Sequence, residues 1–281
     1  MKIAFDIGGT KMRLASSRDG KTIDDIIKIE TPSDDVDSGI NQFCEAVEKL
    51  KVNDEVTAVG GGIAGVLNKD NSILVHSPNI SGWIGYPLKE NLQARLGAPV
   101  VIENDTAVVG LGEAIAGAGT PVGVMAYVTV STGVGGVRIV DGQIDRSTYG
   151  FEIGHQYIDF DRSYCADCPE PGDFESYISG KSLEIRYGKK AYELTDTTLW
   201  EQEAKLLAVG LANTIMHWSP EVVVLGGSMV VGTPSISVDR VREYLKEYLL
   251  VYPELPEIRE ASCGDVGGLS GALALIERTI K

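Results

Sequence analysis

Positive charge is scarce in this sequence. It has 25 lysines and arginines against 40 aspartates and glutamates, which gives a formal net charge of −15 over 281 residues. Proteins that bind nucleic acids or anionic membranes nonspecifically need basic surfaces, so both kinds of partner are disfavoured. Any anionic substrate must therefore be held by local features that act against the overall field of the protein.

Long apolar runs and cysteines are also few. The sequence has no run of about 18 apolar residues, so no membrane span is expected. Residues 1–20 lack the charged leader, apolar core and cleavage site of a secretory signal, which predicts a cytoplasmic protein. The four cysteines, Cys44, Cys165, Cys168 and Cys263, are too few and too unevenly spaced for a disulfide scaffold.

Glycine, in contrast, is abundant, and its residues gather in turns. Of the 281 residues, 33 are glycine, which is about 12% against the ~7% of an average protein. A predicted strand at 2–6 runs into Gly8-Gly9-Thr10, a second strand follows, and Asp19-Gly20 forms a hairpin turn. The same order returns at 124–142, which predicts two related sheet domains that face each other. Strands alternate with helices along the chain, which places it in the α/β class.

Two of the glycine turns suit the binding of phosphate groups. Residues 8–11 and 131–136 each combine glycines with a threonine, so exposed backbone N–H groups and a hydroxyl can approach anionic oxygens. Lys11 adds a point charge, and Asp6 could hold Mg²⁺ through water. A third turn, Gly226-Gly227, could pass close to the adenine or ribose of a nucleotide. The alternative is that these turns are ordinary glycine hairpins.

Several motifs together resemble the ROK (repressor, open reading frame, kinase) family of sugar kinases, and they occur in the order seen there. They are Asp6-Ile-Gly-Gly-Thr-Lys11, Glu103-Asn-Asp105, Ser131-Thr-Gly-Val-Gly-Gly136, Glu152-Ile-Gly-His155 with the cysteine pair that follows it, and Leu225-Gly-Gly227. The resemblance implies an actin-like, ribonuclease H-like fold of two α/β domains around a cleft. It also implies ATP- and Mg²⁺-dependent phosphorylation of a hexose or N-acylhexosamine.

The resemblance also assigns domains and a nucleotide site. We expect a smaller domain from residues 1–116 plus a returning helix at 268–281, and a larger domain from 117–267. DNA-binding members of the family carry an extra N-terminal helix-turn-helix, whereas this chain begins at its first strand, which favours an enzyme. The predicted nucleotide-binding residues are Asp6, Gly8, Gly9, Thr10, Lys11, Thr132, Gly133, Gly135, Gly226 and Gly227.

Asp105 is the predicted catalytic base, because it follows a buried strand and should project from the strand end towards a sugar hydroxyl. The alternative role for Asp105 is the N-cap of the helix 106–117. Asn104 can donate and accept hydrogen bonds to sugar hydroxyls. By resemblance, the remaining sugar-binding residues are Asn79, Glu152, His155 and Glu175.

Zinc-containing ROK kinases pair the histidine of the Glu-x-Gly-His motif with three closely spaced cysteines. Here His155 is followed by Cys165 and Cys168, and Asp173 stands where the third cysteine would be. Carboxylate oxygen is an acceptable zinc ligand, so these four residues form a predicted zinc set. The alternative is a metal-free loop with two thiols.

Glucose is the first substrate expected, with fructose, mannose and N-acetylmannosamine close behind. Single hydrogen bonds in the pocket choose among these sugars, and the sequence does not display them. Two other functions stay open. One is a non-catalytic sugar sensor that uses the same cleft, and the other is an actin-like nucleotide switch. The expected partners are a small sugar and ATP, and a homodimer is common in the family.

Overall fold

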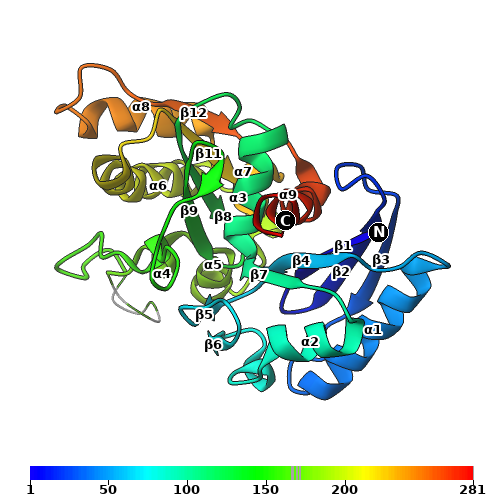
Figure 1. Cartoon of the computed structure of the whole chain (residues 1–281). Coiled ribbons are helices and arrows are strands. Elements are labelled where there is room, and N and C mark those ends of the chain that lie inside the picture. Colours follow the sequence, from blue (N-terminus) through cyan, green and yellow to red (C-terminus); the bar gives the residue numbers. More distant parts are fainter. Residues whose placement is uncertain (166–167, 169, 171, 281) are drawn as a thin grey trace. The chain divides into compact units, whose positions relative to one another are not determined.

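The computed structural model describes residues 1–165, 168, 170 and 172–280, and the chain divides into two compact units (Figure 1). The first unit contains residues 1–116, 146–150 and the chain from 263 onward. The second unit contains residues 117–145 and 151–262. Each unit has its own mixed sheet and its own apolar core.

The sheet of the first unit has five strands in the order β3-β2-β1-β4-β7. They are β1 (Lys2–Ile7), β2 (Lys11–Ser17), β3 (Asp25–Glu30), β4 (Ala58–Ile63) and β7 (Val100–Asn104). β1 pairs antiparallel with β2 and parallel with β4, and β4 pairs parallel with β7. A separate two-stranded sheet joins β5 (Val66–Leu67) to β6 (Leu74–His76).

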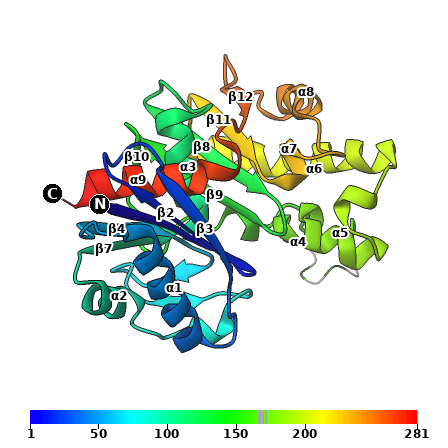
Figure 2. The same cartoon turned by 90° about the vertical axis from the view of Figure 1, so that its right-hand side faces the viewer.

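Helices cover both faces of this sheet. α1 (Val36–Lys51) and α2 (Leu88–Leu96) lie on one face, where Phe43 of α1 packs edge-on against Phe5 of β1 with ring centroids 5.4 Å apart. α3 (Asp105–Ala116) and α9 (Gly267–Thr279) lie on the other face, and Figure 2 shows α1 and α9 on opposite sides of the sheet. A Cβ atom at Gly271 would lie 1.8 Å from the Val108 carbonyl oxygen, so glycine allows the two helix backbones to touch. Two short 3₁₀ turns, η1 (Ser81–Trp83) and η4 (Gly264–Val266), complete the unit.

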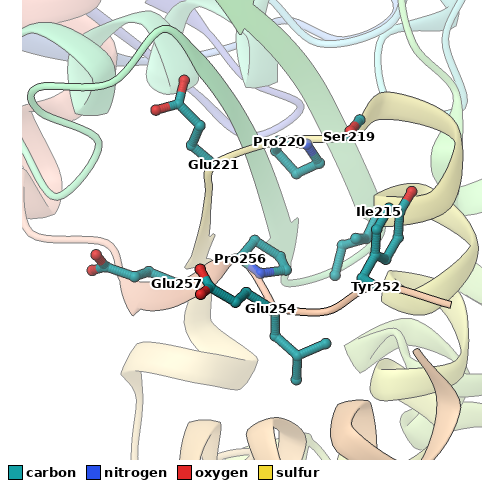
Figure 3. A pocket seen from close by; sticks show the side chains of 9 residues that line it. Ile215, Ser219, Pro220, Glu221, Tyr252, Glu254, Pro256 and Glu257 are labelled. Carbon is teal, nitrogen blue, oxygen red and sulfur yellow. The ribbon is translucent and has the colours of Figure 1, made fainter. Parts of the chain in front are cut away.

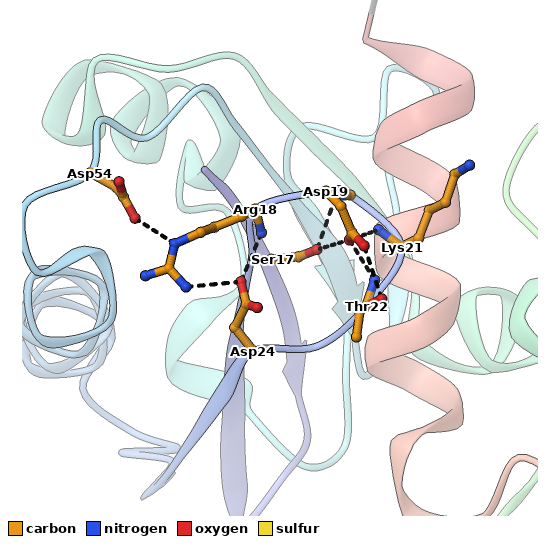
Figure 4. Close-up of polar contacts among 8 residues, drawn as sticks. Ser17, Arg18, Asp19, Lys21, Thr22, Asp24 and Asp54 are labelled. Carbon is orange, nitrogen blue, oxygen red and sulfur yellow. Dashed lines mark hydrogen bonds and ion pairs between the residues drawn. The ribbon is translucent and has the colours of Figure 1, made fainter.

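The turn between β2 and β3 forms around the side chain of Asp19 (Figure 4). Its carboxylate accepts hydrogen bonds from the backbone N–H groups of Lys21 and Thr22, each at 2.7 Å, and from the hydroxyls of Thr22 and Ser17. The backbone bond from Thr22 is the main reason that the pKa of Asp19 lies well below its usual value. The expected hairpin at Asp19-Gly20 is thus confirmed, with aspartate in its usual role of ordering a turn.

The sheet of the second unit has the order β10-β9-β8-β11-β12. Its strands are β8 (Val124–Val130), β9 (Val134–Val140), β10 (Gln143–Ile144), β11 (Val222–Gly226) and β12 (Glu257–Glu260). The helical segments are η2 (Ile153–His155), α4 (Phe174–Ile178), α5 (Gly180–Tyr187), η3 (Ala191–Glu193), α6 (Thr197–Trp218), α7 (Ser228–Val231) and α8 (Val238–Tyr248). The buried side of α6 and residues of β8 and β11 belong to one apolar cluster, and α8 packs on α6.

The two sheets share one topology, which confirms the repeat predicted from the glycine turns. In each, the first strand pairs antiparallel with the second and parallel with the fourth, and the fourth pairs parallel with the fifth. The Asp141-Gly142 turn has φ angles of 50° and 67°, the left-handed pair that suits a two-residue hairpin. The glycine run Gly60-Gly61-Gly62 lies inside β4, where a Cβ at Gly61 would lie 1.9 Å from the Phe5 carbonyl oxygen.

Candidate active site

Parallel strands gather the predicted residues of the first unit at one sheet edge. β1, β4 and β7 are neighbours in the sheet, and their register aligns Ile7 with Ile63 and Ile63 with Asn104. The turn at 8–11 and the Asn104-Asp105 corner therefore follow the same edge. Polar groups beyond the carboxyl ends of parallel strands form the usual ligand site of α/β proteins.

The turn between β1 and β2 is tight and exposes its tip. The Gly8 N–H donates to the Lys11 carbonyl oxygen at 3.0 Å, while the side chains of Thr10 and Lys11 are exposed. A Cβ at Gly9 would lie 2.7 Å from Cβ of Asn79, so the predicted sugar residue Asn79 packs directly against this turn. The fold thus brings a predicted phosphate turn and a predicted sugar residue together.

Asp6 has a partner that the sequence analysis missed. Arg13 stands opposite Asp6 in the β1–β2 register, and its guanidinium donates to Asp6 Oδ2 through Nε, at 3.0 Å, and through Nη2. Arg13 also donates to the carbonyl oxygen of Asp265 at 2.5 Å. Asp6 Oδ1 has no hydrogen bond within the described residues, so this oxygen is the one suited to a water of hydrated Mg²⁺. The paired register of a hairpin was the signal that could have identified Arg13.

The sequence offered Asp105 both as the catalytic base and as the helix cap, and the structure shows how the Glu103-Asn104-Asp105 corner is arranged. The N–H of Ala107 donates to Asn104 Oδ1 at 3.1 Å, so Asn104, and not Asp105, caps the first turn of α3. Asn104 Nδ2 donates to the Gly65 carbonyl oxygen at 3.0 Å. Asp105 is the first residue of α3, and its Oδ1 accepts from the N–H of Thr106 at 2.8 Å. Asn104 thus occupies the N-cap position for which the sequence offered Asp105.

Glu103 connects this corner to the β5–β6 hairpin. One carboxylate oxygen accepts from the Asn104 N–H at 2.9 Å, and the other accepts from Asn71 Nδ2 at 2.7 Å. Burial raises the pKa of Glu103, although both hydrogen bonds oppose the shift. Together with the Asn104–Gly65 bond, this carboxylate fixes the hairpin to the corner that carries Asp105.

The turn at 131–136 in the second unit is held from outside by Glu175. Glu175 Oε2 accepts from the Val134 N–H at 2.7 Å, and a Cβ at Gly133 would lie 2.6 Å from the same oxygen. The N–H groups of Gly180 and Lys181 donate to the carbonyl oxygens of Ser131 and Thr132. Glu175, predicted from resemblance as a sugar ligand, therefore also supports the predicted phosphate turn.

The third glycine turn lies beside the second. Gly227 has φ of 86°, and a Cβ there would lie 2.2 Å from the Val130 carbonyl oxygen at the end of β8. The hydroxyls of Ser228 and Ser131 are 3.0 Å apart. The turns at 131–136, with Thr132, Gly133 and Gly135, and at 226–227 thus meet at the carboxyl ends of two neighbouring parallel strands.

His155 ends the short turn η2 and contacts Asp173, with 3.0 Å between Nδ1 and Oδ2. Burial lowers the pKa of His155, but the hydrogen bond and charge of Asp173, together with the charges of Glu175 and Glu152, outweigh this and raise it. Glu152 and Glu175 therefore both lie within electrostatic range of His155.

The structure does not support the predicted zinc set. The sulfur atoms of Cys165 and Cys168 are bonded to each other, so neither is a thiolate ligand, and the alternative of two free thiols is not observed either. Asp173 Oδ1 accepts from the Ser176 N–H, and Oδ2 contacts His155. Among the described residues, no group of three or more His, Cys, Asp or Glu side chains is arranged to hold a metal ion.

A hollow elsewhere in the second unit contains none of the predicted residues. It has a volume of about 400 Å³ and lies between the end of α6 and the start of β12, where Pro220, Tyr252 and Pro256 face it (Figure 3). Glu221 on its rim accepts hydrogen bonds from the N–H groups of Gly123 and Val124, which is a structural role. Nothing in this hollow extends the candidate site.

Comparison with known proteins finds one family along almost the whole chain. The profile described as "ROK family" matches residues 2–279. Glucokinase of Streptomyces coelicolor is 35% identical over 212 residues, which cover 75% of this chain and 64% of that protein. The chain therefore matches a little less than two thirds of the length of that relative.

Solved structures resemble the chain over almost its whole length. The ROK hexokinase of Thermus thermophilus has a TM-score of 0.84 and 27% identity, and covers 98% of this chain and 99% of its own. A ROK family glucokinase of Streptomyces griseus, solved with glucose and AMPPNP, has a TM-score of 0.80, 27% identity and 99% coverage of both chains. The predicted two-domain, actin-like α/β fold is confirmed.

Within the described residues, no helix is both long and apolar enough to cross a bilayer.

Proposed function

Because this chain belongs to the ROK family, we propose that it is an ATP-dependent sugar kinase that phosphorylates a hydroxyl of a hexose or N-acylhexosamine. The observation that carries the proposal is the carboxyl edge of the first sheet. There, Asp105 begins α3 next to Asn104, which caps the helix, at the same edge as a tight Gly-Gly-Thr-Lys turn. A carboxylate and a phosphate-binding type of turn at one sheet edge suit phosphoryl transfer to an alcohol.

ATP bound with Mg²⁺ would supply the phosphoryl group and part of the charge neutralisation that the transfer needs. The chain's own residues do the rest. Backbone N–H groups of the turns at 8–11 and 131–136 and the Lys11 ammonium group bind phosphate oxygens, and Asp6 Oδ1 holds a water of the metal ion. Asp105 accepts the proton of the reacting sugar hydroxyl.

The sugar is held by Asn79, Asn104, Glu152, His155 and Glu175, whose amide, imidazole and carboxylate groups match the many hydroxyls of a hexose. Glucose is the proposed substrate. Its support is the likeness to the S. coelicolor glucokinase and to the S. griseus enzyme solved with glucose. Fructose, mannose and N-acetylmannosamine are the alternatives.

A coupled assay of ADP release over these four sugars tests the proposal. We expect sugar-dependent release that is fastest with glucose and disappears without Mg²⁺. If one sugar stabilises the protein against heat but none stimulates ADP release, the chain is a sugar sensor and the kinase proposal is wrong. A different preferred sugar would correct only the substrate.

A further inference from the structure

Hydrogen bonds close the loop between η2 and α4, where the family resemblance predicted a zinc ion. The N–H of Phe174 donates to the Gln156 carbonyl oxygen at 3.0 Å, and the N–H of Ile158 donates to that of Gly172 at 2.8 Å. Strand-like pairing of Tyr157 with Asp173 lies between these bonds. The two ends of the loop are therefore joined by protein backbone.

A buried tyrosine fixes the interior of the same loop. The hydroxyl of Tyr177 donates to Asp159 Oδ2 at 3.0 Å and accepts from the Gly172 N–H at 2.9 Å. Asp159 also accepts from the N–H of Tyr164 at 2.9 Å. A structural metal ion contributes by joining distant segments of a loop. Here, the Tyr177–Asp159 network makes the same connections without one.

Asp173 has no carboxylate oxygen left unpaired. Its side chain is only 5% exposed, its Oδ1 accepts from the Ser176 N–H at 3.0 Å as the N-cap of α4, and its Oδ2 contacts His155 Nδ1 at 3.0 Å. A zinc ion would need the same His155 nitrogen or the same carboxylate. The donor set therefore does not fit zinc, and Asp173 occupies the place of the metal against the imidazole ring.

We propose that Asp173 is a positioning residue that holds the His155 ring for the sugar, so that this chain acts as a zinc-independent ROK kinase. The inference rests on the proposed function. Asp173 Oδ2 engages Nδ1 of the ring at 3.0 Å, which leaves Nε2 for a hydrogen bond with a sugar hydroxyl. The side chain of His155 is 57% exposed, so this second nitrogen is accessible.

Two substitutions separate this role from the helix cap. Asp173→Ser keeps an oxygen for the Ser176 N–H but is too short to reach His155, and Asp173→Asn keeps the cap but presents an N–H to the ring. We expect the KM for the sugar to rise roughly 10- to 100-fold in both, as for lost partners of ligating histidines. The affinity for AMPPNP without sugar should stay unchanged.

Imidazole ¹⁵N spectra of the whole enzyme provide a readout that a merely structural role would not move. At a pH above the pKa of His155, where the ring is neutral, its proton should lie on Nδ1 in the wild type, and Asp173→Asn should shift it to Nε2. The matched control is Asp196→Ser, which alters the N-cap of α6 in the same unit without touching His155. It should change neither the spectrum nor the sugar KM.

Zinc content is measured on protein expressed with added zinc and purified under reducing conditions, where Cys165 and Cys168 are thiols. We expect far less than one zinc per chain. Zinc near one per chain that is lost in Cys165→Ser, or an Asp173→Ser enzyme with unchanged sugar KM and ring spectrum, would overturn the inference. If no sugar is phosphorylated, the kinase proposal fails separately, while metal content and ring spectra still decide the role of Asp173.

Discussion

At the residue scale, the proposed catalytic role of Asp105 can be tested with little effect on the fold. Because Asn104 supplies the cap of α3, replacing the carboxylate of Asp105 should leave the helix intact. We predict that Asp105→Asn lowers kcat by roughly 10²- to 10⁴-fold, the usual contribution of a general base, with a much smaller change in sugar affinity. Steady-state kinetics and sugar titration of the same preparation measure both. Near-normal turnover would exclude Asp105 as the base.

A second residue-scale feature is the buried pair of Arg186 and Glu203 in the second unit. Glu203 is 1% exposed, and its Oε1 lies 3.1 Å from Arg186 Nη2. Oε2 of Glu203 and Nε of Arg186 have no hydrogen-bond partner within the described part of the chain. Burial, opposed only in part by the charge of Arg186, raises the pKa of Glu203 from 4.5 to about 7.

A raised carboxyl pKa makes the folded state hold a proton that the unfolded chain has already released. Stability should therefore fall as pH rises from 4.5 to about 7 and then level off. We predict that Glu203→Gln removes up to about 3 kcal/mol of this decline, at about 1.4 kcal/mol per pKa unit. Urea unfolding at several pH values tests it by comparing the slopes of stability against pH, since the substitution also alters the contact with Arg186.

Glu201 on the same helix is the matched control. Its exposed carboxylate is paired with Arg240 and Tyr244, which lower its pKa to about 2. It is ionised in both folded and unfolded chains above about pH 6, so Glu201→Gln should leave the slope between pH 6 and 8 unchanged. A wild-type slope that persists in Glu203→Gln would show that other groups cause it.

At the element scale, the start of α3 depends on Asn104. Its side chain caps the helix and donates to the Gly65 carbonyl oxygen. We predict that Asn104→Ala lowers the free energy of unfolding by about 1 kcal/mol or more, because both bonds are lost. Asn104→Asp keeps the cap and should lose less. Equal losses in the two variants would mean that the cap contributes little.

The turn at 131–136 and helix α4 are also joined by one side chain. Because Glu175 Oε2 accepts from the Val134 N–H, Glu175→Ala should weaken binding of AMPPNP even without sugar, besides weakening sugar binding. Glu175→Gln retains an acceptor for this N–H and should affect mainly the sugar. Isothermal titration with each ligand alone distinguishes the two effects. An unchanged nucleotide affinity in Glu175→Ala would show that the turn holds its shape without Glu175.

At the scale of the whole molecule, the sugar should stabilise the fold. A ligand at 100 times its Kd adds about 2.7 kcal/mol to the native state, which raises the melting temperature by several degrees. We predict this rise with glucose in the absence of nucleotide, measured by calorimetry. An actin-like nucleotide switch would respond to ATP but not to glucose.

Local chemistry made much of this protein predictable from its sequence. The Asp19-Gly20 and Asp141-Gly142 turns form where glycine tolerates positive φ, and helices form where apolar residues recur at helical spacing, as in α1 and α6. The repeated order of strand, glycine turn and strand was enough to predict two related sheets. These features depend on neighbours a few residues away, which the sequence displays directly.

Contacts between distant segments were decided only by the tertiary structure. His155 meets Asp173 across 18 residues and Val134 meets Glu175 across 41, so the sequence could not show that a carboxylate contacts the imidazole ring or that Glu175 holds the turn at 131–136. The reason that Gly60 and Gly61 of β4 are glycines, close packing against α9 and β1, is likewise tertiary. Sequence fixes what each segment can form, whereas the partner of a polar side chain depends on which segments folding brings within 3 Å.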